Sequence, residues 1–140
     1  MTTFELEIHE LSTLVDHLVP LLHQYAIIAF DGDLAAGKTT LARHICEKLD
    51  VKDDISSPTY AIIHTYETIE RTIYHMDLYR LSSERELDDL GLEELFEQPG
   101  TPFFLIEWPD IAIHLLPRPI IWIKIEKTET AARKFSVIIN

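Results

Sequence analysis

The stretch AIIAFDGDLAAGKTTLARHICEKL, residues 26–49, decides the fold of this chain. It opens with a short apolar run, 26–30, of the kind found in a strand that is covered on both faces. It closes with apolar residues at helical spacing over 39–49. Between them, residues 32–39 fit the pattern G-x-x-x-x-G-K-[ST] of a phosphate-binding loop. The order of strand, glycine-containing loop and helix predicts an α/β protein that binds phosphate at this loop.

The chemistry of the loop explains the pattern. Backbone N–H groups of the loop and of the first helical turn can hold phosphate oxygens, and glycine lets the backbone approach closely. We expect Lys38 to reach the β- and γ-phosphates, and the hydroxyl group of Thr39 to bind Mg²⁺. The residues expected to bind the nucleotide here are Asp33, Leu34, Ala35, Ala36, Gly37, Lys38, Thr39 and Thr40.

A P-loop needs an acidic residue for its magnesium ion, commonly at the end of a buried strand. Glu107 ends the apolar run FFLIE, and Asp77 ends TIYHMD. We favour Glu107 as a functional acid, whereas Asp77 taken alone is as consistent with a solvent-facing strand end. His75 alternates with Asp77, so it points either at the site or into the core as a packed, hydrogen-bonded histidine.

The rest of the chain predicts a single α/β domain, residues 1–140, with a mixed parallel and antiparallel sheet flanked by helices. The β-rich runs 59–66 and 72–77 are too close for a helical crossover, so they predict an antiparallel hairpin. Residues 83–86 match a helix-capping box, and Gly91 suits the end of that helix. The other expected elements are a strand at 4–8, a helix at 11–22 with Ser12 as its cap and Pro20 kinking or ending it, a loop at 50–58, a short helix reaching Gln98, a strand at 103–107 and a closing hairpin of 120–126 with 133–139.

Composition excludes several classes of protein. The chain has 24 acidic and 12 basic residues, a formal net charge of −12, which argues against a broad nucleic-acid-binding surface. The single cysteine, Cys46, rules out an intramolecular disulfide and fits a reducing compartment. We expect no transmembrane helix, because no apolar run approaches about 18 residues, and no secretory signal, because the N-terminus is acidic. A cytoplasmic protein is therefore expected.

The class of nucleotide follows from other motifs. Asn140 is the only asparagine, so the Asn-Lys-x-Asp motif that reads guanine is absent. Residues 84–97 carry seven acids and one arginine, a poor composition for the arginine-bearing lid of a small-molecule kinase. ATP hydrolysis is the favoured activity. A P-loop small-molecule kinase and a non-hydrolysing, ATP-gated binding module remain alternatives.

Five segments together resemble the bacterial TsaE family over nearly the whole chain: GDLAAGKTT at 32–40, SPTY at 57–60, IYHMDLYRL at 73–81, GLEE at 91–94 and IEWPD at 106–110. The resemblance implies a small P-loop ATPase that uses ATP and Mg²⁺. It also implies a role in making N-threonylcarbamoyladenosine beside the anticodon of tRNA, with the proteins TsaD and TsaB as partners. Because the chain is acidic, we expect no strong direct binding to tRNA and no membrane partner.

The resemblance also implies roles for individual residues. Lys38, Asp77 and Glu107 correspond to catalytic residues, and Thr39 and Glu107 to the magnesium ligands. Residues 57–59 take the place of a switch-like loop that faces the γ-phosphate.

Three further positions, outside the catalytic residues and the metal ligands, bear on the expected nucleotide site. Trp108 is expected to pack near the nucleotide or a partner, and Arg133 to contact the nucleotide. The family commonly has glycine where this chain has Ala35. If that position needs a positive φ, alanine costs on the order of 1 kcal/mol and could slow hydrolysis.

Overall fold

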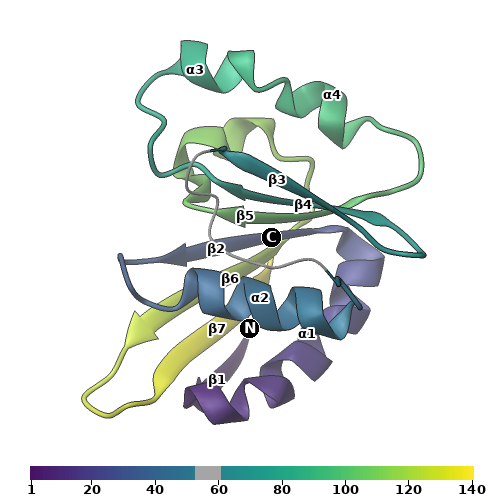
Figure 1. Cartoon of the computed structure of the whole chain (residues 1–140). Coiled ribbons are helices and arrows are strands. Elements are labelled where there is room, and N and C mark those ends of the chain that lie inside the picture. The colour runs from purple at the N-terminus through teal and green to yellow at the C-terminus, as the bar shows by residue number, and fades with distance from the viewer. Residues whose placement is uncertain (53–60) are drawn as a thin grey trace.

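One sheet organises the molecule in a computed structural model that describes residues 1–52 and 61–140 (Figure 1). Over those residues the sheet has seven strands in the order β1-β7-β6-β2-β5-β4-β3. The strands β4, β5, β2 and β6 run parallel to one another, and the outer pairs β3–β4, β6–β7 and β1–β7 are antiparallel. The mixed sheet predicted from the sequence is confirmed.

The strands are β1 (Thr2–Leu6), β2 (Ile27–Gly32), β3 (Ile63–Glu67), β4 (Thr72–Asp77), β5 (Phe103–Glu107), β6 (Ile121–Lys127) and β7 (Arg133–Ile139). The α-helices are α1 (Leu11–Tyr25), α2 (Lys38–Lys48), α3 (Glu84–Asp89) and α4 (Leu92–Phe96), and the 3₁₀ helices are η1 (Ile8–Glu10) and η2 (Pro109–Leu115). Both predicted hairpins are present, as β3–β4 and β6–β7.

Helices cover both faces of the sheet. The larger apolar cluster joins α1 and α2 to one face, through side chains such as Leu18, Leu41 and Phe30. The smaller cluster joins α3, α4 and η2 to the other face, through side chains such as Leu87 and Ile106. In Figure 1, α3 and α4 lie above the sheet and α1 and α2 below and in front of it. The central strands are therefore buried on both sides, which explains their unbroken apolar runs.

Two local expectations for the first helix differ from the structure: Ser12 as its cap, and Pro20 as its end. Ser12 lies inside α1 rather than at its cap, because η1 leads directly into the helix and the N-cap residue is Glu10. Pro20 does not end α1, which continues to Tyr25. A proline removes one N–H donor. Here Leu14, Leu18 and Leu22 are fully buried, and their packing holds the helix together across the proline.

The predicted start and end of α3 agree with the structure. Ser83 caps the helix by accepting a hydrogen bond from the Glu86 N–H at 3.2 Å. Gly91 separates α3 from α4 with a left-handed conformation, φ 66°. The capping box and the glycine therefore bound this helix as their sequence positions predicted.

The parallel strands of the sheet end at one edge and begin at the other. We call the edge where β2, β4, β5 and β6 end the carboxyl edge, and the edge where they begin the amino edge. The loop after β2 lies at the carboxyl edge, at the left of Figure 1. Binding crevices of open α/β sheets lie at this edge, so a binding site is expected there.

Candidate phosphate-binding site

The loop between β2 and α2 is shaped by two glycines with different tasks. At Gly32, an added Cβ would lie 2.8 Å from the Ile125 carbonyl oxygen, so only glycine lets β2 pass this close to β6. At Gly37, φ is 114°, a conformation that side chains disfavour, although the space around it is open. Gly37 is also the N-cap of α2. The loop therefore turns sharply into a helix N-terminus, whose first amides lack intrahelical partners.

Ala35 occupies a position that suits glycine. Its φ is 63°, in the left-handed region, and it lies in the exposed part of the loop. A left-handed conformation costs an L-residue roughly 1–2 kcal/mol. The departure from the family pattern noted in the sequence is thus a real source of backbone strain in this chain.

Lys38 is held over the loop by carbonyl groups. Its Nζ donates hydrogen bonds to the backbone oxygens of Gly32 (2.5 Å) and Asp33 (2.7 Å). The residue is 5% exposed, and this burial lowers the pKa of its ammonium group. The carboxylates of Glu107 and Asp77 oppose that shift. Lys38 is therefore a buried cation whose charge is supported by acids at the ends of β5 and β4.

Trp108 forms one wall around this cation. It follows β5 with a φ of 56°, and its ring centroid lies 4.1 Å from Lys38 Nζ. The ring of Tyr79 packs against it, with centroids 4.7 Å apart. A cation over an aromatic face is stabilised by the quadrupole of the ring, more so where water is excluded. Trp108 thus contacts Lys38 of the loop, and its packing near a nucleotide or a partner stays a prediction.

Thr39, Glu107 and His75 form a chain of hydrogen bonds. Thr39 Oγ1 donates to Glu107 Oε1 at 2.7 Å, and His75 Nε2 lies 2.6 Å from Glu107 Oε2. His75 is 0% exposed and Glu107 2%. Each oxygen of one buried carboxylate thus faces its own partner, and the plane of that carboxylate is fixed. The two open readings of His75 are resolved: it is packed in the core and also joined to the site.

Asp77 is brought beside Glu107 by strand register. The two residues are direct partners between β4 and β5, so both carboxylates stand at the carboxyl edge on the same face of the sheet. Asp77 Oδ1 accepts a hydrogen bond from the Tyr79 N–H at 3.0 Å. The sequence had left this residue balanced between site and solvent, and the register places it at the site.

The remaining predicted residues fall into three groups. Asp33 and Leu34 are exposed on the loop, whereas Ala36 is buried beneath it; Thr40 lies in the first turn of α2. Arg133 begins β7 at the carboxyl edge but is separated from β2 by β6. Arg133 therefore shares the edge with the loop, two strands away from β2, and its contact with the nucleotide stays a prediction. The switch-like segment, residues 57–59, lies outside the described residues.

Two features of the site were missed by sequence reasoning. One is the contact of Trp108 with Lys38, which depends on a left-handed turn that no local pattern announced. The other is the hydrogen bond between His75 and Glu107. Its only signal was the alternation of His75 with Asp77, which placed His75 on the correct face without naming its partner.

The oxygen atoms at this edge suit a hard divalent cation. Mg²⁺ prefers carboxylate, hydroxyl and phosphate oxygens. The Thr39 hydroxyl and a Glu107 carboxylate oxygen lie 2.7 Å apart, and Asp77 stands next to them. This donor set fits magnesium better than zinc, which favours nitrogen and sulfur.

The parallel strands, the glycine turn after β2 and the buried lysine at the start of α2 together define a P-loop α/β protein. Comparison with known families makes the assignment more specific. Residues 6–135 match the family model described as threonylcarbamoyl adenosine biosynthesis protein TsaE, and the chain belongs to this family.

Curated relatives agree with that assignment, and each carries the name tRNA threonylcarbamoyladenosine biosynthesis protein TsaE. The protein from Rickettsia felis is 41% identical over 81% of this chain and 66% of its own length. The protein from Bacillus subtilis is 36% identical over 79% and 67%, and that from Treponema pallidum 32% over 84% and 84%. The chain thus spans about two-thirds of the length of the first two relatives.

The fold has a counterpart among solved structures. The crystal structure of Bacillus subtilis YdiB matches with a TM-score of 0.75 at 24% identity, over 99% of this chain and 84% of that one. This likeness concerns the fold.

Within the described residues, no helix combines the length and the apolar character needed to cross a membrane.

Proposed function

We propose that this chain is a cytoplasmic, Mg²⁺-dependent ATPase that supports threonylcarbamoyladenosine modification of tRNA, acting with TsaD and TsaB. One observation carries the ATPase proposal. Lys38, Thr39, Asp77 and Glu107 converge at the carboxyl edge, around the helix N-terminus that follows the loop. Family membership supports the pathway. The sequence resemblance to the TsaE family suggests TsaD and TsaB as the partners.

The residues divide the work between binding and hydrolysis. Loop amides and Lys38 hold the phosphates, and the hydrogen bonds of Lys38 to two loop carbonyls are exchanged for bonds to phosphate oxygens. Thr39 and Glu107 would hold Mg²⁺, which would supply positive charge against the negative charge of the phosphates. Asp77, beside Glu107, would orient the attacking water.

An acidic chain can bind ATP because the positive field is local. Backbone amides, the buried Lys38 ammonium and the metal ion act within the loop, whatever the net charge of −12 elsewhere. The chain is short, has few arginines and shows no obvious arginine finger in its sequence. We therefore propose that the free protein turns over slowly and that a partner completes the site, as arginine fingers do in other P-loop enzymes.

The test is ATP turnover with and without the TsaB–TsaD pair, for the native chain, Lys38→Ala and Lys48→Ala. We expect Lys38→Ala to lower turnover by at least about 100-fold, because oriented charge at the phosphates is among the largest catalytic contributions. Lys48 is the matched control: it ends the same helix and forms an exposed ion pair with Asp16. Its replacement should leave turnover within about two-fold.

Other outcomes would select other functions. Native turnover by Lys38→Ala would overturn the site. Phosphate transfer to a small metabolite would indicate a kinase, and ATP binding with no turnover even beside the partners would indicate a nucleotide-gated binding module. If cells depleted of this protein keep normal levels of the modified nucleoside, the proposed role in the pathway is wrong.

A further inference from the structure

We propose that His75 is a positioning residue for the metal site: it holds the Glu107 carboxylate so that one oxygen faces the Thr39 hydroxyl. The proposal rests on the proposed function, since it assumes that Thr39 and Glu107 hold Mg²⁺. His75 itself would touch neither the nucleotide nor the metal ion.

Strand register builds the contact. Asp77 pairs with Glu107 and His75 with Leu105, so His75 stands one pleat behind the carboxylate on the same face of the sheet. From there its Nε2 reaches Glu107 Oε2 at 2.6 Å, while Thr39 Oγ1 occupies Oε1 at 2.7 Å. With both oxygens engaged from different elements, the carboxylate cannot rotate without breaking a hydrogen bond.

Because both side chains are buried, water cannot replace His75 as the hydrogen-bond donor to Glu107. His75 is 0% exposed and Glu107 2%. Behind His75, the ring of Tyr66 lies at a centroid distance of 6.4 Å and a tilt of 35°, and Tyr66 is 4% exposed. The imidazole is therefore held by the β3–β4 hairpin on one side and by β5 on the other.

The second ring nitrogen argues against a purely structural role. Within the described parts of the chain, His75 Nδ1 is buried without a hydrogen-bond partner. An apolar residue would fill this place in the sheet without a buried polar atom to satisfy, so packing alone gives no reason for histidine here. The Nε2 contact to Glu107 is what histidine adds. In metal sites, such partners of a ligand tune binding, and their loss typically weakens it about 10–100-fold.

The experiment separates the donor at Nε2 from the bulk of the ring. His75→Gln keeps an N–H donor that can reach Oε2, whereas His75→Met fills similar space without a donor. Affinity for Mn²⁺ is measured by electron paramagnetic resonance on the protein–ADP complex at constant pH. A fluorescent ADP analogue in EDTA reports nucleotide binding without metal, and circular dichroism reports the fold.

We expect His75→Met to weaken Mn²⁺ binding about 10-fold, with metal-free nucleotide affinity within about two-fold of native, and His75→Gln to recover most of the loss. If His75→Met does not fold, His75→Asn replaces it, because its amide is too short to reach Oε2. Native Mn²⁺ affinity in His75→Met, or equal losses in the Met and Gln variants, would overturn the proposal. If the native chain binds neither ADP nor Mn²⁺, the proposed function fails instead.

Discussion

The two edges of the sheet each pair a histidine with a glutamate, and the pairs differ in distance and in exposure. At the carboxyl edge, His75 and Glu107 are 2.6 Å apart with side chains 0% and 2% exposed. At the amino edge, His23 of α1 and Glu70 of the β3–β4 turn are 3.9 Å apart with side chains 41% and 79% exposed. Burial, more than residue type, decides what such a pair contributes.

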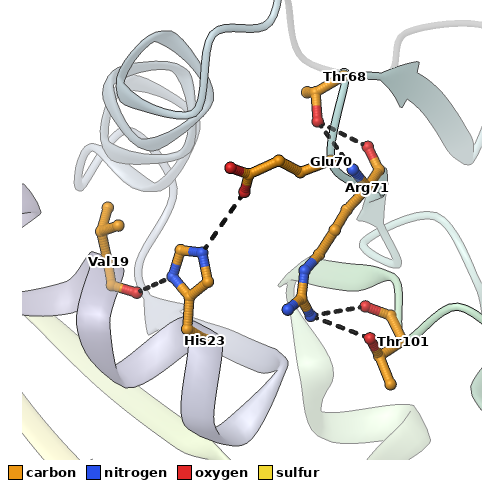
Figure 2. Close-up of polar contacts among 6 residues, drawn as sticks. All are labelled: Val19, His23, Thr68, Glu70, Arg71 and Thr101. Carbon is orange, nitrogen blue, oxygen red and sulfur yellow. Dashed lines mark hydrogen bonds and ion pairs between the residues drawn. The ribbon is translucent and has the colours of Figure 1, made fainter.

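The amino-edge pair spans an open cleft. The cleft has a volume of about 810 Å³ and lies between the ends of α1 and α2 and the β3–β4 turn. Figure 2 shows His23 bonded to the Val19 carbonyl on its own helix and reaching Glu70 through its other nitrogen. Arg71 of the same turn donates to the Thr101 carbonyl at 2.9 Å (Figure 2). These contacts fix a surface turn while the side chains of His23 and Glu70 stay exposed.

The largest expected difference between the two edges is in the coupling energy between the histidine and the glutamate of each pair, measured in the protein without ligands. A double-mutant cycle with His75→Met and Glu107→Met should give a coupling of about 2–3 kcal/mol, because each single change strands a buried polar group. The same cycle with His23→Met and Glu70→Met should give less than about 0.5 kcal/mol. Urea unfolding in EDTA measures both. Equal coupling energies at the two edges would contradict the statement that burial decides what such a pair contributes.

The carboxyl edge was the more predictable of the two because its signals are local. The G-x-x-x-x-G-K-[ST] spacing fixes the loop, and an acid that ends an apolar strand identified Glu107. Both patterns need only a few consecutive residues. The hydrogen bond from His75 joins strands β4 and β5, so it depends on a register that the sequence does not state.

Other misses have the same physical origin. The run of α1 across Pro20 depends on the burial of leucines against the sheet, which a local breaker rule ignores. The contact between Trp108 and Lys38 needs a left-handed turn at Trp108, a residue with no special tendency to adopt it. Local chemistry predicted the groups at the site, whereas tertiary packing decided how they are held.

The second prediction, of intermediate size, concerns the pH dependence of stability that the buried Cys46 gives to the core behind the amino-edge cleft. Cys46 lies near the end of α2, close to the cleft in the chain, yet it is 0% exposed. Burial raises the pKa of its thiol from 9.0 to about 12. The folded state therefore holds this proton more tightly than the unfolded state. Its contribution to stability is complete below pH 9 and is lost as the pH rises from about 9 to 12.

The loss should be about 1 kcal/mol at pH 10 relative to pH 8. It is measured as the difference between the native chain and Cys46→Ala, whose stability lacks this step, in unfolding free energies at the two pH values. Identical pH dependence in both proteins would mean that water from the cleft reaches the thiol.

The smallest expected effect compares the two ends of β2. Ala26 precedes the strand at the amino edge with a φ of 68°, and Ala35 follows it at the carboxyl edge with a φ of 63°. Glycine relieves the left-handed strain at each position but also gains freedom in the unfolded chain. We therefore expect Ala35→Gly and Ala26→Gly each to raise the free energy of unfolding by about 0.5–1 kcal/mol, measured by urea denaturation.

Nucleotide affinity then separates the two edges. Ala26 caps α1, far along β2 from the loop, so Ala26→Gly should stabilise the fold and leave ADP affinity unchanged. Ala35→Gly alters the loop itself, and relief of its strain should change ADP affinity or turnover by a few-fold. If both variants changed nucleotide binding equally, the effect would come from overall stability and the loop would have no special sensitivity. If only Ala35→Gly did so, the alanine in this loop sets the behaviour of the carboxyl edge.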